Sequence, residues 1–225
     1  MITLFSILLT LIVYRMTLFL AGRFPTPLTS PVFLSTILVI AILLGFHISY
    51  EEYTPAKEIM TFLLGPATVA LAVPIYKNRD LLSKYFGAAL MGLIAGTILT
   101  IATALLLAKG IHFSKTVLLA LSIKSVTVPV ATEIGKILKG NQPLIVAFVI
   151  ITGMIGAMFG PKLLSLFKID HPYARGLSIG AIAHGIGTAE AVKEGEIQGA
   201  VSGAAMGIAA ILTSCILPYI IPIFL

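Results

Sequence analysis

Long apolar runs separated by short polar gaps dominate the chain. The runs 1–22, 85–108, 143–161 and 199–225 approach or exceed the roughly 20 apolar residues that a helix needs to cross a bilayer. A shorter run, 31–44, begins with proline, which suits the first position of a helix because the missing N–H has no helical partner there. This pattern predicts an all-α, polytopic helical membrane protein.

A third apolar run, 59–76, is interrupted, and a polar loop is predicted before it over 45–58. Proline inside a span removes a helical hydrogen bond, so the freed carbonyl must face protein or water. Gly65 and Pro66 could therefore open the backbone beside a binding site, with Thr68 as a hydroxyl donor. A proline kink packed by neighbouring helices explains the same pattern equally well.

The second half of the chain repeats one layout. In 116–140 and again in 173–196, a short apolar helix meets a polar break, resumes for a short helix, and is followed by a Gly/Ala-rich span. Broken helices at matching positions of two repeats point to a transport site near the membrane midplane. We therefore divide a single membrane domain, 1–225, into four membrane segments in 1–110 and two repeated broken-helix units in 111–225. This predicts about eight membrane segments, two or three of them broken or re-entrant.

Composition strengthens the membrane prediction. The chain is 58% hydrophobic and 11% charged, with a mean hydropathy of +1.07, whereas soluble domains carry about 25% charged residues. Its formal charge of +6 arises from 15 basic and 9 acidic side chains. The basic groups lie mostly in the gaps, which suits anionic lipid headgroups and the positive-inside rule. No basic stripe with interleaved aromatics indicates a nucleic-acid partner.

Four segments carry a family resemblance: LLGPATVALAVPIY, SIKSVTVPVATEI, ITGMIGAMFGP and HGIGTAEAVKEGEIQGAVSGAAMGIAAIL. In this order, over nearly the whole chain, they resemble the LrgB/CidB family of bacterial membrane proteins. Ser30-Pro31 and Gly140-Asn141 depart from the Asn-Pro and paired glycines common in the family, and both departures lie in connectors.

The resemblance implies a multi-pass protein of the bacterial cell membrane, usually paired with a smaller LrgA/CidA-type membrane partner. We also expect a homo-oligomer. Two functions are attached to the family. One is control of murein hydrolase export and autolysis, by analogy to antiholins and holins. The other is transport of small carboxylates: pyruvate in bacteria, and glycolate and glycerate in the related plastidal translocator.

Lys124 in the first break is the candidate cation for a substrate carboxylate. A lysine at the centre of a membrane helix costs roughly 3 kcal/mol on the insertion scale, so it is seldom placed there without a partner. Lys124 is surrounded by hydroxyl donors and by the start of a half-helix. The free N–H groups of that half-helix favour an anion. The surrounding residues are Ser122, Ser125, Thr127 and Pro129. Alternatively, Lys124 pairs with Glu133 or Glu190, or extends to the interface.

His184 in the second break could carry a proton, since its unperturbed pKa is about 6.5, or serve as a neutral hydrogen-bond donor that holds the loop. Gly185 and Gly187 allow the backbone to leave the helix, and Thr188 is predicted to cap the helix that follows. Glu190 either complements the dipole of that helix or faces Lys124. The glutamates at 194 and 196 are predicted to lie in a solvated turn with no chemistry.

Small residues at every fourth position predict close helix packing in the last two spans. The positions are Gly156, Gly160, Gly195, Gly199, Gly203 and Gly207.

An enzyme is not expected. Ser122 and Lys124 are two residues apart and would point to different sides of a helix, and the chain has no zinc signature, phosphate loop or Cys/His cluster. A holin that forms lesions in the membrane does not require a lysine that faces broken helices, so this feature favours a selective transport path over a hole. We therefore predict a transporter of small monocarboxylates of the pyruvate, glycolate or lactate class, working by alternating access. The alternative is an antiholin- or holin-like regulator of murein hydrolases. No cofactor or metal is expected, and a proton and Na⁺ are the alternatives for a coupling ion.

Overall fold

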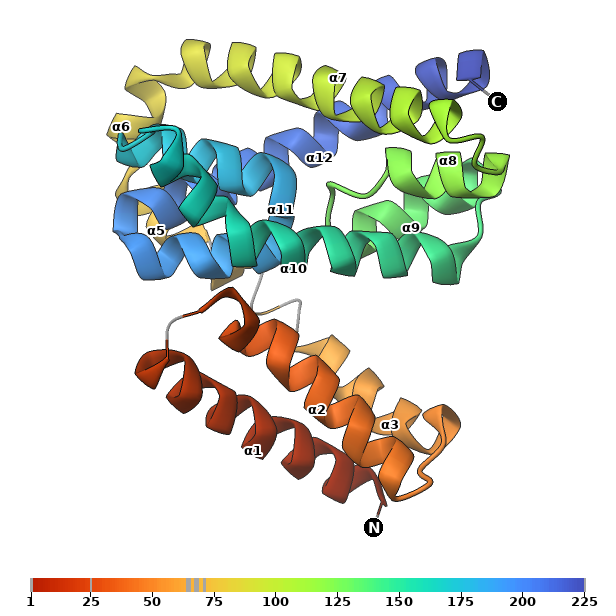
Figure 1. The fold of residues 1–225 in the computed structure, drawn as a ribbon. Helices are drawn as coiled ribbons and strands as arrows, with labels where there is room; N and C mark the ends of the chain where they lie inside the picture. Colours follow the sequence, from red (N-terminus) through yellow and green to blue (C-terminus); the bar gives the residue numbers. More distant parts are fainter. Residues whose placement is uncertain (1, 25, 64–65, 67–68, 71, 225) are drawn as a thin grey trace. The chain divides into compact units, whose positions relative to one another are not determined.

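The computed structural model describes residues 2–24, 26–63, 66, 69–70 and 72–224, and the regular elements in these ranges are all helical (Figure 1). By internal contacts the chain divides into two compact units, Met1–Leu71 and Ala72–Leu225. Four helices are long and apolar enough to cross a membrane, namely α1, α7, α10 and α12. The predicted all-α, polytopic membrane protein is confirmed. The division at 110/111 and the single membrane domain stay predictions.

The elements with described bounds in the first unit are α1 (Ile2–Arg23), the short 3-10 turn η1 (Pro27–Thr29), α2 (Pro31–Gly45) and α3 (Tyr50–Phe62). The helices of the second unit are α5 (Ala72–Lys77), α6 (Arg79–Lys84), α7 (Phe86–Gly110), α8 (Lys115–Ser122), α9 (Val128–Ile137), α10 (Gln142–Leu166), α11 (Pro172–Glu194) and α12 (Glu196–Phe224).

In the first unit, α1 packs against both α2 and α3. Its buried positions are Ser6, Val13 and Thr17, and hydroxyl contacts support the packing. Thr17 Oγ1 donates to the carbonyl of Pro31 at 3.3 Å, and Thr10 Oγ1 lies 3.1 Å from the hydroxyl of Tyr53.

The polar loop predicted over 45–58 is wrong from residue 50 onward, where α3 begins. A capping box starts this helix: Ser49 Oγ accepts the N–H of Glu52, and Glu52 Oε2 accepts the N–H of Ser49 at 2.8 Å. Because these reciprocal bonds satisfy N–H groups that the helix itself leaves free, a polar sequence can still form a helix here.

In the second unit, α8 and α9 are joined by residues 123–127, and both contribute buried residues to one apolar cluster. Gly140, just after α9, is so close to α8 that an added Cβ would overlap Leu119 Cδ2. A continuous helix would separate the two residues by about 30 Å at 1.5 Å per residue, so the chain turns back between the helices. We call α8, residues 123–127 and α9 the first hairpin. Its base adjoins the start of α10, where Ile145 also lies against Gly140.

The helix α11 also turns back, at His184, whose φ of 42° and ψ of −135° are not helical. Arg175 near the start of α11 forms an ion pair with Glu194 at its end, with Nη2 and Oε1 2.7 Å apart. Their separation of 19 positions would span about 28 Å in a straight helix. We call α11 the second hairpin. Its base adjoins the end of α10, because Arg175 Nη2 also donates to the carbonyl of Pro161 at 3.1 Å.

The two hairpins therefore enter from opposite ends of α10. Each broken helix turns back on itself near one end of α10, which is itself long and apolar enough to cross a membrane. Pro161 does not end α10, which continues to Leu166; proline is tolerated in membrane helices because neighbouring groups satisfy the freed carbonyl.

Candidate functional site

Val149 in α10 connects the tips of the two hairpins. Its side chain is fully buried in the same apolar cluster as Ile123 and Val126 of the first tip. Its carbonyl lies 3.0 Å from Nε2 of His184 at the second tip. Val149 is the eighth residue of α10, which has 25 residues. The second tip therefore contacts α10 within the span and not at its ends, and the first tip shares a buried apolar cluster with the same residue.

Lys124 lies at the first tip between the buried side chains of Ile123 and Val126 and is itself only partly exposed. Its Nζ donates to Ser125 Oγ at 3.1 Å. Among the residues that the structure describes, no carboxylate lies within ion-pair distance of it. The alternative pairing with Glu133 or Glu190 is wrong, because both glutamates pair with lysines of their own helices. The tip thus presents a cation without a protein counter-ion.

The groups predicted around Lys124 separate into two kinds. Ser122 is buried and donates to the carbonyl of Leu119 at 2.7 Å, so its hydroxyl is used inside α8. Thr127 occupies the N-cap position of α9 without a side-chain capping bond, and the exposed Pro129 is the second residue of that helix. Ser125 and Thr127 therefore supply hydroxyls beside the lysine.

His184 is buried at the second tip, with 3% of its surface exposed. Because a carbonyl can only accept, Nε2 donates to Val149. The ring lies against Gly153, where an added Cβ would be 2.6 Å from Cε1. A positive φ in a non-glycine residue is strained and persists only when its surroundings hold it. Of the two predicted roles, the hydrogen bond that holds the loop matches this geometry, and proton transfer stays a prediction.

The second helix of α11 begins differently from the prediction. Thr188 is not its cap, because helical geometry resumes directly after His184. Thr188 is instead fully buried and donates to the carbonyl of His184 at 2.8 Å, while its Oγ1 lies 2.9 Å from Ser202 Oγ in α12. Gly185 is partly exposed at the tip, and Gly187 packs tightly against Ala183. Thr188 therefore ties the tip to α12.

Two predictions about the glutamates need correction. Glu190 does not face Lys124, because it is partly exposed and pairs with Lys193 at 2.7 Å. Glu194 is not in a solvated turn: its carboxylate forms a two-point pair with Arg175, with side chains only 18% and 11% exposed. Arg175 Nη1 also donates to Ile169 O at 3.0 Å. Glu196 is exposed, as predicted.

A family model of the LrgB-like family matches residues 10–223 of the chain. The chain belongs to the LrgB-like family. It is 35% identical over 218 residues to YxaC of Bacillus subtilis (strain 168), covering 97% of this chain and 95% of that protein. It is 32% identical over 191 residues to the antiholin-like protein LrgB of the same strain, covering 85% and 83%. It is 31% identical over 221 residues to the holin-like protein CidB of Staphylococcus aureus (strain N315), covering 98% and 96%. No solved structure matches the chain.

The remaining predicted site residues of this LrgB-like protein lie in the first unit. Gly65 and Thr68 fall outside the described residues, and Pro66 is exposed. Their part in a site stays a prediction.

The predicted packing glycines of this LrgB-like chain differ in their surroundings. Gly156 lies against Ala183 of the second hairpin, where an added Cβ would be 2.5 Å from the alanine Cβ. Gly199 lies against Val192, Gly195 against Gln198, and Gly203 is buried. At Gly160 and Gly207 an added Cβ would meet no described atom within 4 Å. The predicted stripe is therefore a packing surface over only part of its length.

Sequence reasoning missed three features of this LrgB-like chain. Gly176 and Gly180 bring the second hairpin onto the backbone of α12 at Gln198 and Ser202; their four-residue spacing is the same small-residue signal used elsewhere. Arg175 gave no local signal, since its partner lies at the other end of a hairpin. Arg15 lies within an apolar span, where any cation is conspicuous.

Proposed function

We propose that this protein transports a small monocarboxylate across the bacterial cell membrane. The observation that carries the proposal is Lys124: a cation at the tip of a hairpin, with no carboxylate partner among the described residues. A partly buried cation without a counter-ion is costly in a membrane, which supports a ligand as the source of the negative charge.

The arrangement of the hairpins supports transport rather than a simple structural role for the lysine. In this proposal each hairpin would cover part of the membrane thickness from its own face, with both tips beside α10. A ligand at the tips is therefore separated from either face by one hairpin, and a displacement of one hairpin at a time would give alternating access.

The chemistry at the first tip favours a small carboxylate. Lys124 would pair with the carboxylate, Ser125 and Thr127 would donate hydroxyl hydrogen bonds, and the free N–H groups at the start of α9 favour the same charge. The neighbouring Ile123 and Val126 are apolar and fully buried. This suits a substrate with one charge and a short carbon chain, such as pyruvate, glycolate or lactate.

The names of two relatives favour a second function. Proteins similar to this chain carry the names antiholin-like LrgB and holin-like CidB. Regulation of murein hydrolases, together with a smaller LrgA/CidA-type membrane partner, is therefore the alternative, and it would also follow indirectly if carboxylate flux altered autolysis. We also propose that the chain is not an enzyme. A coupling ion, with a proton and Na⁺ as the alternatives, stays a prediction.

Uptake of labelled pyruvate, glycolate and lactate into liposomes containing the purified chain tests the proposal. We expect saturable uptake of at least one of them, and a loss of at least tenfold on Lys124→Ala. Lys136→Ala is the matched control, because Lys136 is exposed and already paired with Glu133 at 2.7 Å; it should leave uptake unchanged.

Adding the smaller membrane partner to the same liposomes distinguishes the alternative. Release of a trapped neutral dye without saturable carboxylate uptake would contradict the transporter and favour a hole-forming role. Equal uptake by the wild type and Lys124→Ala would remove Lys124 from the site.

A further inference from the structure

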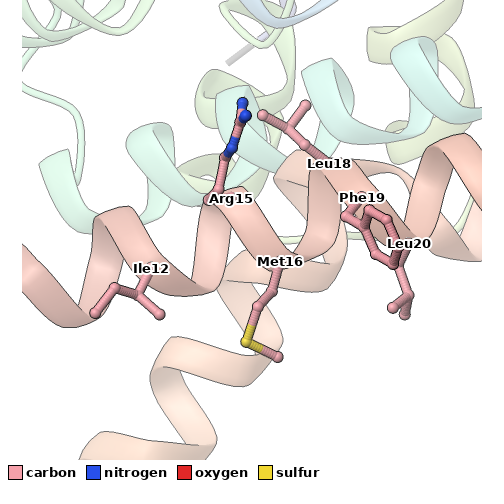
Figure 2. A pocket seen from close by; sticks show the side chains of 6 residues that line it. All are labelled: Ile12, Arg15, Met16, Leu18, Phe19 and Leu20. Carbon is pink, nitrogen blue, oxygen red and sulfur yellow. The ribbon is translucent and has the colours of Figure 1, made fainter.

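Arg15 is a charge within an apolar span that the proposed transport site does not use. It lies in α1, whose central window has a mean hydropathy of 2.1. It forms no hydrogen bond or ion pair with any residue in the part of the chain that the structure describes. Arg15 is one of six residues of α1 that line a pocket, and Figure 2 shows their side chains: Ile12, Arg15, Met16, Leu18, Phe19 and Leu20.

The side chain points away from the helices that pack on α1. Val13 and Thr17 are buried against the rest of the first unit. Arg15 is two positions from each, a rotation of about 200° around the helix. The face that it occupies is otherwise apolar and open within this unit: Ile12 is 58% exposed and Phe19 is 69% exposed.

The depth of Arg15 argues against a lipid phosphate as its partner. The 22 residues of α1 span about 33 Å, and Arg15 lies about 4 Å from the middle of the helix. The hydrocarbon core is about 30 Å thick, so about 11 Å of hydrocarbon separates the backbone at Arg15 from the nearer headgroups. This exceeds the length of an arginine side chain.

A second copy of the chain also fails to supply the charge. A two-fold contact centred on this face would place two arginines together, since such interfaces bring the same surface of each copy into contact. In addition, α1, α7 and α10 contain no Asp or Glu, and α12 has only Glu196 at its first position. The long spans of another copy thus offer no carboxylate at this depth.

We propose that the face of α1 formed by Ile12, Arg15 and Phe19 docks against a membrane helix of a different protein that carries an Asp or Glu near its middle. The apolar side chains would pack against the partner helix, and the arginine would form a two-point pair with the carboxylate in the absence of water. This proposal is independent of the transport function, because it concerns a different unit and needs no substrate.

Photo-crosslinking in membranes of cells that express the full chain tests this surface. A photoreactive residue at Phe19 should give one discrete protein adduct, and the same residue at the buried Val13 should give none. Arg15→Gln should reduce the adduct at least tenfold and Arg15→Lys should retain most of it. Removing a charge from a span favours insertion, so loss of the adduct at unchanged protein level reports the contact.

The crosslinked peptide must come from a membrane span of another protein with a central Asp or Glu. Replacing that acid by Lys should abolish the adduct, and combining the replacement with Arg15→Glu should restore it. An adduct only with phospholipid, with a second copy, or with another segment of the same chain would overturn the proposal. So would an adduct that Arg15→Gln leaves intact, or a loss of carboxylate uptake by the purified Arg15→Gln protein alone.

Discussion

The two hairpins have the same layout, but their tips are held in different ways. The first tip is a nonhelical segment, residues 123–127, in which the charged end of Lys124 donates to the neighbouring Ser125. The second tip turns at the single residue His184, which is wedged against Gly153 and bonded to α10. Two further contacts hold the same hairpin: Thr188 with Ser202 of α12, and Glu194 with Arg175 at its base.

This difference separates ligand binding from support. A site that must release its ligand keeps a charge without a protein counter-ion, as Lys124 does among the described residues, whereas a structural element satisfies its polar groups internally. The comparison predicts that substitutions in the second hairpin cost stability, and that substitutions at the first tip change binding.

The largest expected effect is on the contact between the second hairpin and α12. In Gly180→Ala the new Cβ would overlap the backbone of Ser202, and the helices must separate; we expect a loss of about 3 kcal/mol in the free energy of unfolding. The matched change in the first hairpin, Gly135→Ala, meets only the flexible ends of Ile145 and Gln142 and should be within about 1 kcal/mol of wild type.

Thermal stability in detergent measures both variants, for example as the temperature at which half of the protein remains monodisperse on a sizing column. The chain has no tryptophan, so a method without tryptophan fluorescence is needed. Equal losses for the two glycines would contradict the distinction between the hairpins.

The next effect compares the two tips directly. His184→Ala leaves a cavity beside Gly153 and removes the hydrogen bond to Val149, so we expect a loss of about 2 to 3 kcal/mol. Lys124→Ala removes a partly exposed charge without a counter-ion and should change stability by less than about 1 kcal/mol while it reduces uptake. The same stability assay, run beside the uptake assay, separates the two outcomes; a Lys124→Ala protein that fails to fold would assign the lysine a structural role.

The smallest effect concerns the ion pair of each hairpin. Glu194→Gln breaks the two-point pair with Arg175, whose side chains are largely covered, and should cost about 1 to 2 kcal/mol. Glu133→Gln breaks an exposed pair with Lys136 in the first hairpin and should cost less than about 0.5 kcal/mol. If the two variants melt at the same temperature, the base of the second hairpin is not fastened by this pair.

Local patterns predicted most of the helices and both breaks. The runs that became α1, α2, α7 and α10 were long, apolar and bounded by proline or charge, and each of these signals acts within a few residues. The helix α3 was missed because its signal, the Ser49–Glu52 capping box, lies in a polar stretch without helical periodicity.

Only part of the candidate site could be predicted from the sequence. Lys124 stood out because a cation among apolar residues is rare whatever the fold. The partners of Glu190 and Glu194 could not be inferred, because side-chain pairing depends on which segments the tertiary structure brings within a few ångströms.

The sequence by itself determined that this is a helical membrane protein with a charge at its first break and a histidine at its second. Those features follow from hydrophobicity and from the local effects of glycine, proline and charge, which need no distant partner. Only the tertiary structure decided that both broken helices turn back, at opposite ends of α10, and that His184 bonds to Val149, which is buried in the same apolar cluster as the first tip. The direction of a chain after a break depends on packing against residues far along the sequence, as Arg175 on Glu194 and Gly140 on Leu119 show.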